Sequence, residues 1–263
     1  MSFSGRTIAN SFKEILKIGS GNTGITTSLQ VVKDGAGNQS ALYVSDDQIK
    51  IQPENDDTTT LVDIKDKDGD TKFVIDSTND YVKALGHQVN TNIQDFYLVS
   101  SALEPSSTDQ WTALGVGGGG RTHSAADVYG GTGGTPSTSF TIATTADDMV
   151  CHYFYVPFNI TIDSVHVWFG ANGATGDDVK FSVMSYDVVT TAGSTSGDLS
   201  SGVENCASAS AIAGAGYEQA YYQSLTVSTA NVDSGKIIMG FVAQDGTSSD
   251  LSIRLQLVYH LRG

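Results

Sequence analysis

Hydrophobic positions near the start of the chain follow a helical period. Ile8, Phe12, Ile15 and Leu16 lie at i, i+4, i+7 and i+8, and they share one face of a helix of about three turns. The glycines within residues 19–21 favour the end of this helix. So short a helix with an apolar stripe is unstable alone, so it packs either on this chain's own core or on a partner. The pattern predicts an N-terminal anchor with a short helix over residues 1–24 and leaves both interpretations open.

From Leu29 to about Ala84 the pattern changes to short alternating runs, which predict β-strands. Turn-rich clusters at Asp34–Asn38 and Asp66–Asp70 lie about 32 residues apart, and each is followed by a further strand, turn and strand. Each copy offers few apolar residues for its length, too few to close a core within one chain. We therefore interpret residues 25–100 as a β-hairpin stalk or neck in which several chains cover each other's apolar faces.

The densest strand pattern occupies residues 137–263 and predicts a jelly-roll-like β-sandwich head domain. The candidate strands are Ser139–Ala143, Met149–Val156, Ile160–Phe169, Val179–Val188, Glu218–Val227, Lys236–Gln244 and Leu251–Leu261. The Ser-, Gly-, Ala- and Thr-rich segment Thr190–Ala215 is expected to be a surface loop. Residues 101–136 contain two glycine clusters and are expected to form a Gly-rich bridge. The predicted fold class is therefore mainly β.

Composition agrees with this class and excludes some functions. Fourteen Lys and Arg against 29 Asp and Glu give a formal net charge of −15, which disfavours binding to nucleic acid or to an anionic membrane. No apolar run is long enough for a transmembrane helix, so no membrane insertion is expected. The first residues show no signal-peptide pattern, which indicates a protein made without export. Two cysteines are too few for a disulfide scaffold.

No motif points to catalysis or to a cofactor. The glycine clusters lack the Lys-Ser/Thr pair of a phosphate-binding loop, and no nucleophile elbow or reactive-cysteine setting occurs. The histidines are scattered without metal-ligand spacing. Asp66, Asp68 and Asp70 alternate as in a calcium loop but lack its Gly and terminal acid, so a hairpin turn explains them better, and calcium stays an open alternative. We expect no enzyme activity, no cofactor and no metal site.

Aromatic residues of the predicted sandwich are the best candidates for ligand contact. Trp168, Tyr217 and Tyr221 fall in or beside its strands, and exposed Tyr and Trp side chains stack on sugars or bury at interfaces. The alternative is that these side chains belong to the core or to subunit contacts.

The layout as a whole resembles virion appendage and decoration proteins of tailed bacteriophages, particularly those of marine phages. The segments that carry the resemblance are residues 7–16 (TIANSFKEIL), 22–25 (NTGI), 32–42 (VKDGAGNQSAL), 73–83 (FVIDSTNDYVK), 156–163 (VPFNITID) and 258–261 (VYHL). These segments span nearly the whole chain, and they are structural turns and strands rather than catalytic motifs.

The resemblance implies a homotrimer on the surface of the phage particle, assembled in the host cytoplasm, with its N-terminal region toward the virion and the sandwich outward. The expected function is that of a structural virion protein, a trimeric head-decoration or short fibre protein bound to capsid or tail proteins through the anchor residues Ile8, Phe12, Ile15 and Leu16. The alternative is a tail fibre or spike that binds host-surface glycans. A location on the head and one on the tail both remain open.

Overall fold

The computed structural model describes residues 16–19, 24–54, 56–103, 110–116, 129–139, 152–172, 178–188, 199–211, 219–244 and 249–262. The chain divides into two compact units, Met1–Asn90 (unit 1) and Thr91–Gly263 (unit 2). The described residues are all-β: they contain no helix, and so none long and apolar enough to cross a membrane.

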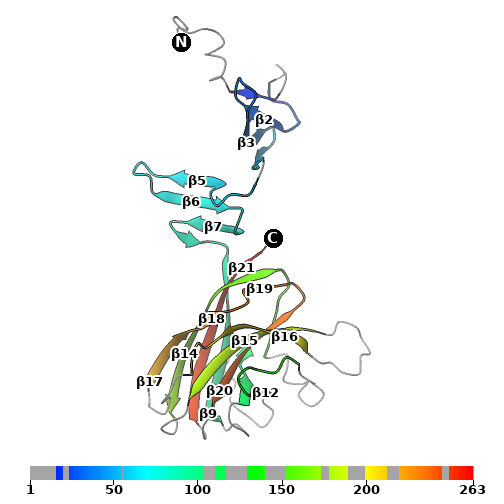
Figure 1. The fold of residues 1–263 in the computed structure, drawn as a ribbon. Helices are drawn as coiled ribbons and strands as arrows, with labels where there is room; N and C mark the ends of the chain where they lie inside the picture. The colour runs from blue at the N-terminus through cyan, green and yellow to red at the C-terminus, as the bar shows by residue number, and fades with distance from the viewer. Residues whose placement is uncertain are drawn as a thin grey trace, which may run out of the picture. The chain divides into compact units, whose positions relative to one another are not determined.

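Unit 1 holds two small antiparallel sheets of four strands each (Figure 1). The first has the order β1-β2-β3-β4, with bounds Lys17–Ile18, Gln30–Lys33, Gln39–Val44 and Ile49–Ile51. The second has the order β5-β6-β7-β8, with bounds Val62–Lys65, Thr71–Asp76, Tyr81–Ala84 and His87–Gln88. Strands adjacent in sequence are adjacent in each sheet, because short turns connect antiparallel neighbours.

The two sheets share the strand–turn–strand–turn–strand repeat that the turn clusters indicated. Strands β2, β3 and β4 correspond to β5, β6 and β7, and the hairpin turns between the first two strands of each set have the same hydrogen bonds. Asp34 N–H donates to the Asn38 carbonyl at 3.0 Å, and Asp66 N–H donates to the Asp70 carbonyl at 3.0 Å. Each turn has a glycine with positive φ at its fourth position, where an L side chain would be strained.

Unit 2 is a β-sandwich-like arrangement of two antiparallel sheets. The six-stranded sheet has the order β11-β9-β21-β14-β17, and β19 also pairs with β14. The bounds are Thr91–Leu103 (β9), Gly115–Val116 (β11), Ile160–Asn172 (β14), Gln219–Ser224 (β17), Asn231–Val232 (β19) and Ser249–Leu261 (β21).

The seven-stranded sheet has the order β12-β10-β20-β15-β16-β18, and β13 also pairs with β20. Its bounds are Gln110–Ala113 (β10), Tyr129–Thr132 (β12), Phe154–Tyr155 (β13), Val179–Asp187 (β15), Ser200–Ala207 (β16), Thr226–Val227 (β18) and Ile237–Gln244 (β20).

The main hydrophobic core of unit 2 draws on both sheets, and alternation along the strands builds it. In β21, Leu251, Ile253, Leu255 and Leu257 are buried, and the residues between them are more exposed. Buried side chains of β15 and β20 join the same core, among them Phe181. The predicted strands Ile160–Phe169, Val179–Val188, Lys236–Gln244 and Leu251–Leu261 are confirmed. Alternation gives β21 one inward face, whereas the residues of β20 are all buried.

A second cluster of buried side chains includes Trp111, Tyr186 and Phe241. Trp111 donates its Nε1–H to the Gly133 carbonyl at 3.0 Å, and Tyr186 donates its hydroxyl to the Ser137 carbonyl at 2.9 Å. The segment 129–139 is therefore held to the rest of unit 2 by these two hydrogen bonds to its backbone, as well as by the pairing of β12 with β10.

Two expected segment boundaries differ from the structure, and most of the predicted helix falls on residues that the structure does not describe. The predicted helix with Ile8, Phe12 and Ile15 lies outside the described residues, and Leu16 is described and is not helical. The division between Asn90 and Thr91 gives the end of the expected neck to unit 2, since β9 is paired with β21 along its length. Parts of the expected bridge form β10, β11 and β12.

The expected loop Thr190–Ala215 contains strand β16, so that assignment is wrong at residues 200–207. Its composition is poor in β-formers, but β16 pairs with β15 and β18 and buries Asn205 and Cys206. Tertiary pairing outweighs the weak local preference.

Candidate binding surfaces

The Asp-rich turn at residues 66–70 satisfies its own acidic groups. The Oδ1 atom of Asp66 accepts the backbone N–H groups of Asp68 and Asp70, both at 3.0 Å, and Lys72 Nζ lies 2.9 Å from Oδ2. The Lys72 ammonium and the Asp70 N–H lower the pKa of Asp66. No group of three His, Cys, Asp or Glu that could hold a metal ion occurs among the described residues. These contacts are those of a hairpin turn.

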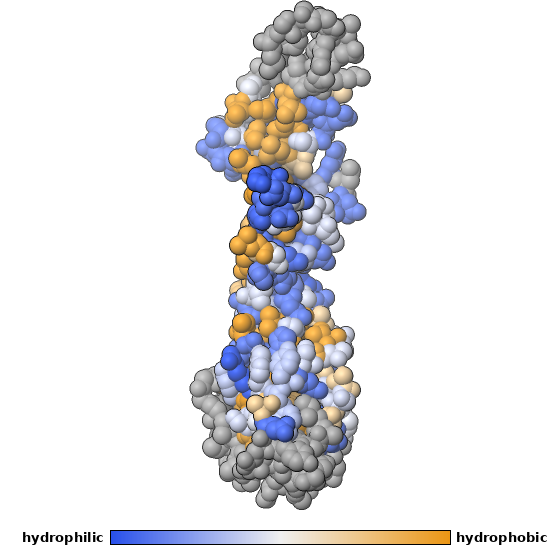
Figure 2. Space-filling model, turned by 90° about the vertical axis from the view of Figure 1, so that its left-hand side faces the viewer, coloured by the Kyte–Doolittle hydropathy of each residue, from blue (hydrophilic) through white to orange (hydrophobic). Residues whose placement is uncertain are grey.

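The first sheet of unit 1 has an uncovered aliphatic face. Leu42 lies opposite Ile51 and Val44 opposite Ile49, so the four side chains share one face. Ile49 is 76% exposed, and none of the four is buried. Hydrophobic residues gather over this sheet in Figure 2. We call these four residues the first apolar face.

The second sheet repeats the feature. Strand pairing places Val62, Ile64, Phe73, Ile75, Val82 and Ala84 on one face, which we call the second apolar face. None of these six is buried, and Val74, on the opposite face, is the one buried hydrophobic residue among the described residues of unit 1. A sheet of three or four short strands needs its apolar face covered to be stable. The described residues of unit 1 therefore carry two apolar faces and form no hydrophobic core cluster.

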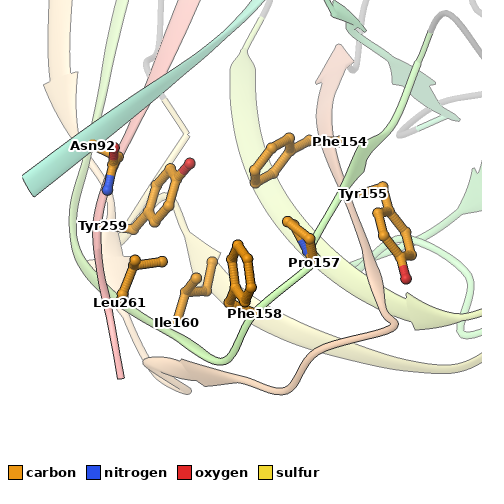
Figure 3. A pocket seen from close by; sticks show the side chains of 8 residues that line it. All are labelled: Asn92, Phe154, Tyr155, Pro157, Phe158, Ile160, Tyr259 and Leu261. Atoms are coloured by element: carbon orange, nitrogen blue, oxygen red, sulfur yellow. The ribbon is translucent and has the colours of Figure 1, made fainter. Parts of the chain in front are cut away.

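A pocket of about 280 Å³ opens on unit 2 (Figure 3). Its lining consists of Asn92, Phe154, Tyr155, Pro157, Phe158, Ile160, Tyr259 and Leu261. Phe154 and Tyr259 lie with ring centroids 5.7 Å apart, while Phe158 is 63% exposed. The hydroxyl of Tyr155 points away from the other rings in Figure 3. The pocket is apolar, with Asn92 as its one amide.

The outer surface of the six-stranded sheet has a different character. Trp168 and Tyr222 lie opposite each other on β14 and β17, with ring centroids 5.6 Å apart and exposed fractions of 41% and 56%. His166 stacks on Tyr222 with a centroid separation of 6.0 Å. We call Trp168, Tyr222 and His166 the aromatic platform.

Hydrogen bonds fix the platform's rings. His166 Nδ1 lies 2.9 Å from the Tyr222 hydroxyl oxygen, and Nε2 lies 3.0 Å from Ser164 Oγ. Both nitrogens of the imidazole are therefore engaged, which restricts rotation of the ring.

A charged group lies beside the platform, on the two strands next to it. Arg254 donates Nε–H to Asp95 Oδ1 at 3.2 Å and Nη2–H to Oδ2 at 3.0 Å, and its guanidinium carbon lies 5.9 Å from the Trp168 ring centroid. Gln256 and the Tyr97 hydroxyl also donate to Asp95. Burial raises the pKa of Asp95, but these hydrogen bonds outweigh it, and the pKa lies below its ordinary value. Asp95 is thus held as a carboxylate.

The aromatic residues chosen from the sequence lie in different environments in the structure. Trp168 lies on the outer surface, as ligand contact requires, whereas Tyr221 turns inward and stacks on Phe169 with ring centroids 4.9 Å apart. Tyr217 lies outside the described residues, as do Ile8, Phe12 and Ile15. Leu16 is 73% exposed just before β1.

Tyr222 is among the aromatic residues of the predicted sandwich but was not selected as a contact residue, and sequence reasoning missed Arg254 and Asp95. The alternation of the strand could have indicated which tyrosine points outward. Successive residues of a strand face opposite sides, so an inward Leu225 places Tyr221 inward and Tyr222 outward. The pairing of Asp95 with Arg254 joins residues far apart in the chain, and nothing in the spacing indicates it.

No protein-family model matches this chain, and no curated protein matches it.

Proposed function

We propose that the chain is a non-enzymatic structural protein of a tailed-phage virion, a homotrimeric head-decoration or short fibre protein that associates through unit 1. The observation that carries the proposal is the pair of uncovered apolar faces, on sheets with a single buried hydrophobic residue among those described. The number of chains and the virion come from the resemblance of the turn and strand segments to phage appendage proteins.

The energetics support self-association. Burying a Leu, Ile, Val or Phe side chain contributes roughly 1.5–3 kcal/mol. Ten apolar side chains lie on the two faces, and the same faces of other copies can cover them. We take a second copy of the chain as the partner that covers these faces. Every copy carries both faces, and the two faces are similar in shape and chemistry because they belong to repeated sheets. Folding of unit 1 and assembly are then coupled.

For unit 2 we propose a jelly roll. The strand orders β9-β21-β14-β17 and β10-β20-β15-β16 support it. With these eight strands lettered B to I in chain order, the sheets read BIDG and CHEF, an arrangement of two interlocked Greek keys. Such heads suit a structural or recognition role, and the fold alone assigns no chemistry.

The oligomeric state tests the proposal. Sedimentation equilibrium of the full chain should give about 83 kDa, three chains of 27.6 kDa. Ile49→Lys with Ile51→Lys should convert the species to monomer, because two charges then lie on the first apolar face. Gln39→Lys with Gln48→Lys adds the same charge to exposed positions off that face and should leave the mass unchanged. A monomeric wild-type chain would contradict the proposal.

Particle labelling tests the virion assignment. Gold-conjugated antibody should decorate intact particles, over the head for a decoration protein and on the tail for a fibre. Absence of gold from particles on which the epitope is accessible would contradict it. Phe12→Asp with Ile15→Asp should give a soluble trimer that no longer joins particles, if the N-terminal region is the anchor.

A further inference from the structure

We propose that the aromatic platform of unit 2 binds an uncharged oligosaccharide. The site comprises Trp168, Tyr222 and His166, with the Asp95–Arg254 pair beside them. This inference goes beyond the structural role proposed above and does not depend on it, because every group of the site lies in unit 2.

The platform offers two exposed aromatic faces, those of Trp168 and Tyr222, whose ring planes are tilted by 44° to each other. The C–H face of a pyranose ring packs on an aromatic face, and two neighbouring rings match successive sugar units. Trp168 and Tyr222 are 41% and 56% exposed, and Trp168 stays exposed between the buried residues Val167 and Phe169. His166 holds Tyr222 through the 2.9 Å contact at its hydroxyl. Since the rings are held before a ligand arrives, binding orders few side chains and loses little entropy.

Polar groups flank the rings at the places where sugar hydroxyls need them. Strand pairing puts Arg254 directly opposite Trp168 and Gln256 opposite His166. Asp95 accepts from both, so a carboxylate, a guanidinium and an amide form one hydrogen-bonded row, and the guanidinium carbon lies 5.9 Å from the Trp168 ring centroid. A hydroxyl both donates and accepts, and this set offers both functions with fixed geometry.

The composition of this surface favours a sugar over another copy of the chain. The outward positions beside the platform include Ser164, Ser252 and Ser224, and the aliphatic side chains of β14 and β21 turn inward except Val258, which lies opposite Ser164. A permanent subunit contact is more apolar, as the two apolar faces of unit 1 are.

Charge favours an uncharged ligand. Asp95 pairs with Arg254 and neutralises it locally, and the chain carries a net charge of −15 that repels polyanions.

Intrinsic fluorescence gives a direct test on the full-length protein. The chain has two tryptophans, and Trp111 is 1% exposed, so collisional quenching by acrylamide reports mainly on Trp168. The probes are uncharged tetrasaccharides of glucose, galactose, mannose and N-acetylglucosamine, with sialylated and sulfated oligosaccharides for comparison. At least one uncharged probe should bind and protect Trp168 from acrylamide. Binding of none of them, or of charged probes alone, would overturn the proposal.

Variants then locate the binding by titration calorimetry. Trp168→Ala and Tyr222→Ala should each weaken affinity for the bound probe about tenfold or more, because each removes a stacking surface. Tyr155→Ala removes an equally exposed aromatic side chain (53%) from the pocket of Figure 3 and should leave affinity unchanged. Unchanged affinity in both platform variants would overturn the assignment.

The oligomeric state of the same samples separates this proposal from the previous one. Sugar binding by a monomeric protein would support the platform and contradict the trimer. A change of mass in Trp168→Ala would instead make this surface a subunit contact and overturn the proposal.

Discussion

At the scale of single residues, Leu85 is the clearest local conflict in the chain. Leu85 and Gly86 connect β7 and β8 with φ values of 51° and 82°, the pair of positive angles that a two-residue hairpin turn requires. Asn-Gly suits this turn, whereas leucine loses about 1–2 kcal/mol in the left-handed region. The side chain is also 70% exposed, so it gains little within its own chain. Contact with another copy would account for it.

The variant Leu85→Asn tests this explanation. Asparagine relieves the backbone but removes an apolar group whose burial between chains is worth roughly 1.5–3 kcal/mol. We expect net weaker association, seen as dissociation at a higher protein concentration by sedimentation velocity. Asp80→Asn changes another residue with positive φ (56°) without altering apolar area, and its assembly should match that of the wild type. A higher melting temperature for Leu85→Asn at unchanged mass would show that Leu85 faces solvent.

At the scale of elements, the edge strand β12 depends on a glycine. A Cβ atom at Gly130 would lie 2.7 Å from Phe241 Cε1 and 3.3 Å from Trp111 Cβ. Gly130→Ala should therefore destabilise unit 2 by about 1–3 kcal/mol, measured by chemical denaturation. Gly134→Ala is the matched control, since a Cβ there meets nothing within 4 Å. Equal stability of the two variants would contradict close packing of this segment.

The packing of β12 on β10 also shows why parts of the fold could not be predicted from the sequence. Strands β14, β15 and β21 could be predicted because alternating runs leave one choice of inward face, and β20 because its run of apolar residues is long. Strand β10 has a short run at residues 110–113, and the glycines that follow favour a loop by local preference. Yet Trp111 is buried and Gly130 fits against it, a match that arises only after β10 and β20 pair.

The residues of the candidate sites could likewise be predicted only in part. Trp168 could be chosen from its residue type, but its neighbours Tyr222 and Arg254 come from strands β17 and β21. Their proximity depends on which strands pair and in which register, and neither the pairing nor the register can be inferred from the residue pattern of one strand. Tyr221 was chosen for the same reason as Trp168, and a shift of one position turns it into the core.

At the scale of the whole chain, the two units differ in what stabilises them. Unit 2 has two clusters of buried side chains, including fully buried Phe96, Phe181 and Phe241. Unit 1 has Val74 as its buried hydrophobic residue among those described. Hydrophobic burial within one chain can therefore support unit 2, while the function proposed above requires other copies to cover the apolar faces of unit 1.

Calorimetry of the full chain should therefore show two transitions that respond differently to concentration. If unit 1 melts as its trimer dissociates, a tenfold rise in concentration adds about 0.9 kcal/mol per chain and raises that midpoint by about 5 °C. The transition of unit 2 should not move. Ile49→Lys with Ile51→Lys should abolish the first transition and preserve the second, because those side chains lie on the first apolar face and outside the core of unit 2. A single midpoint independent of concentration would mean that unit 1 is stable without a partner, and its apolar faces would then need another explanation.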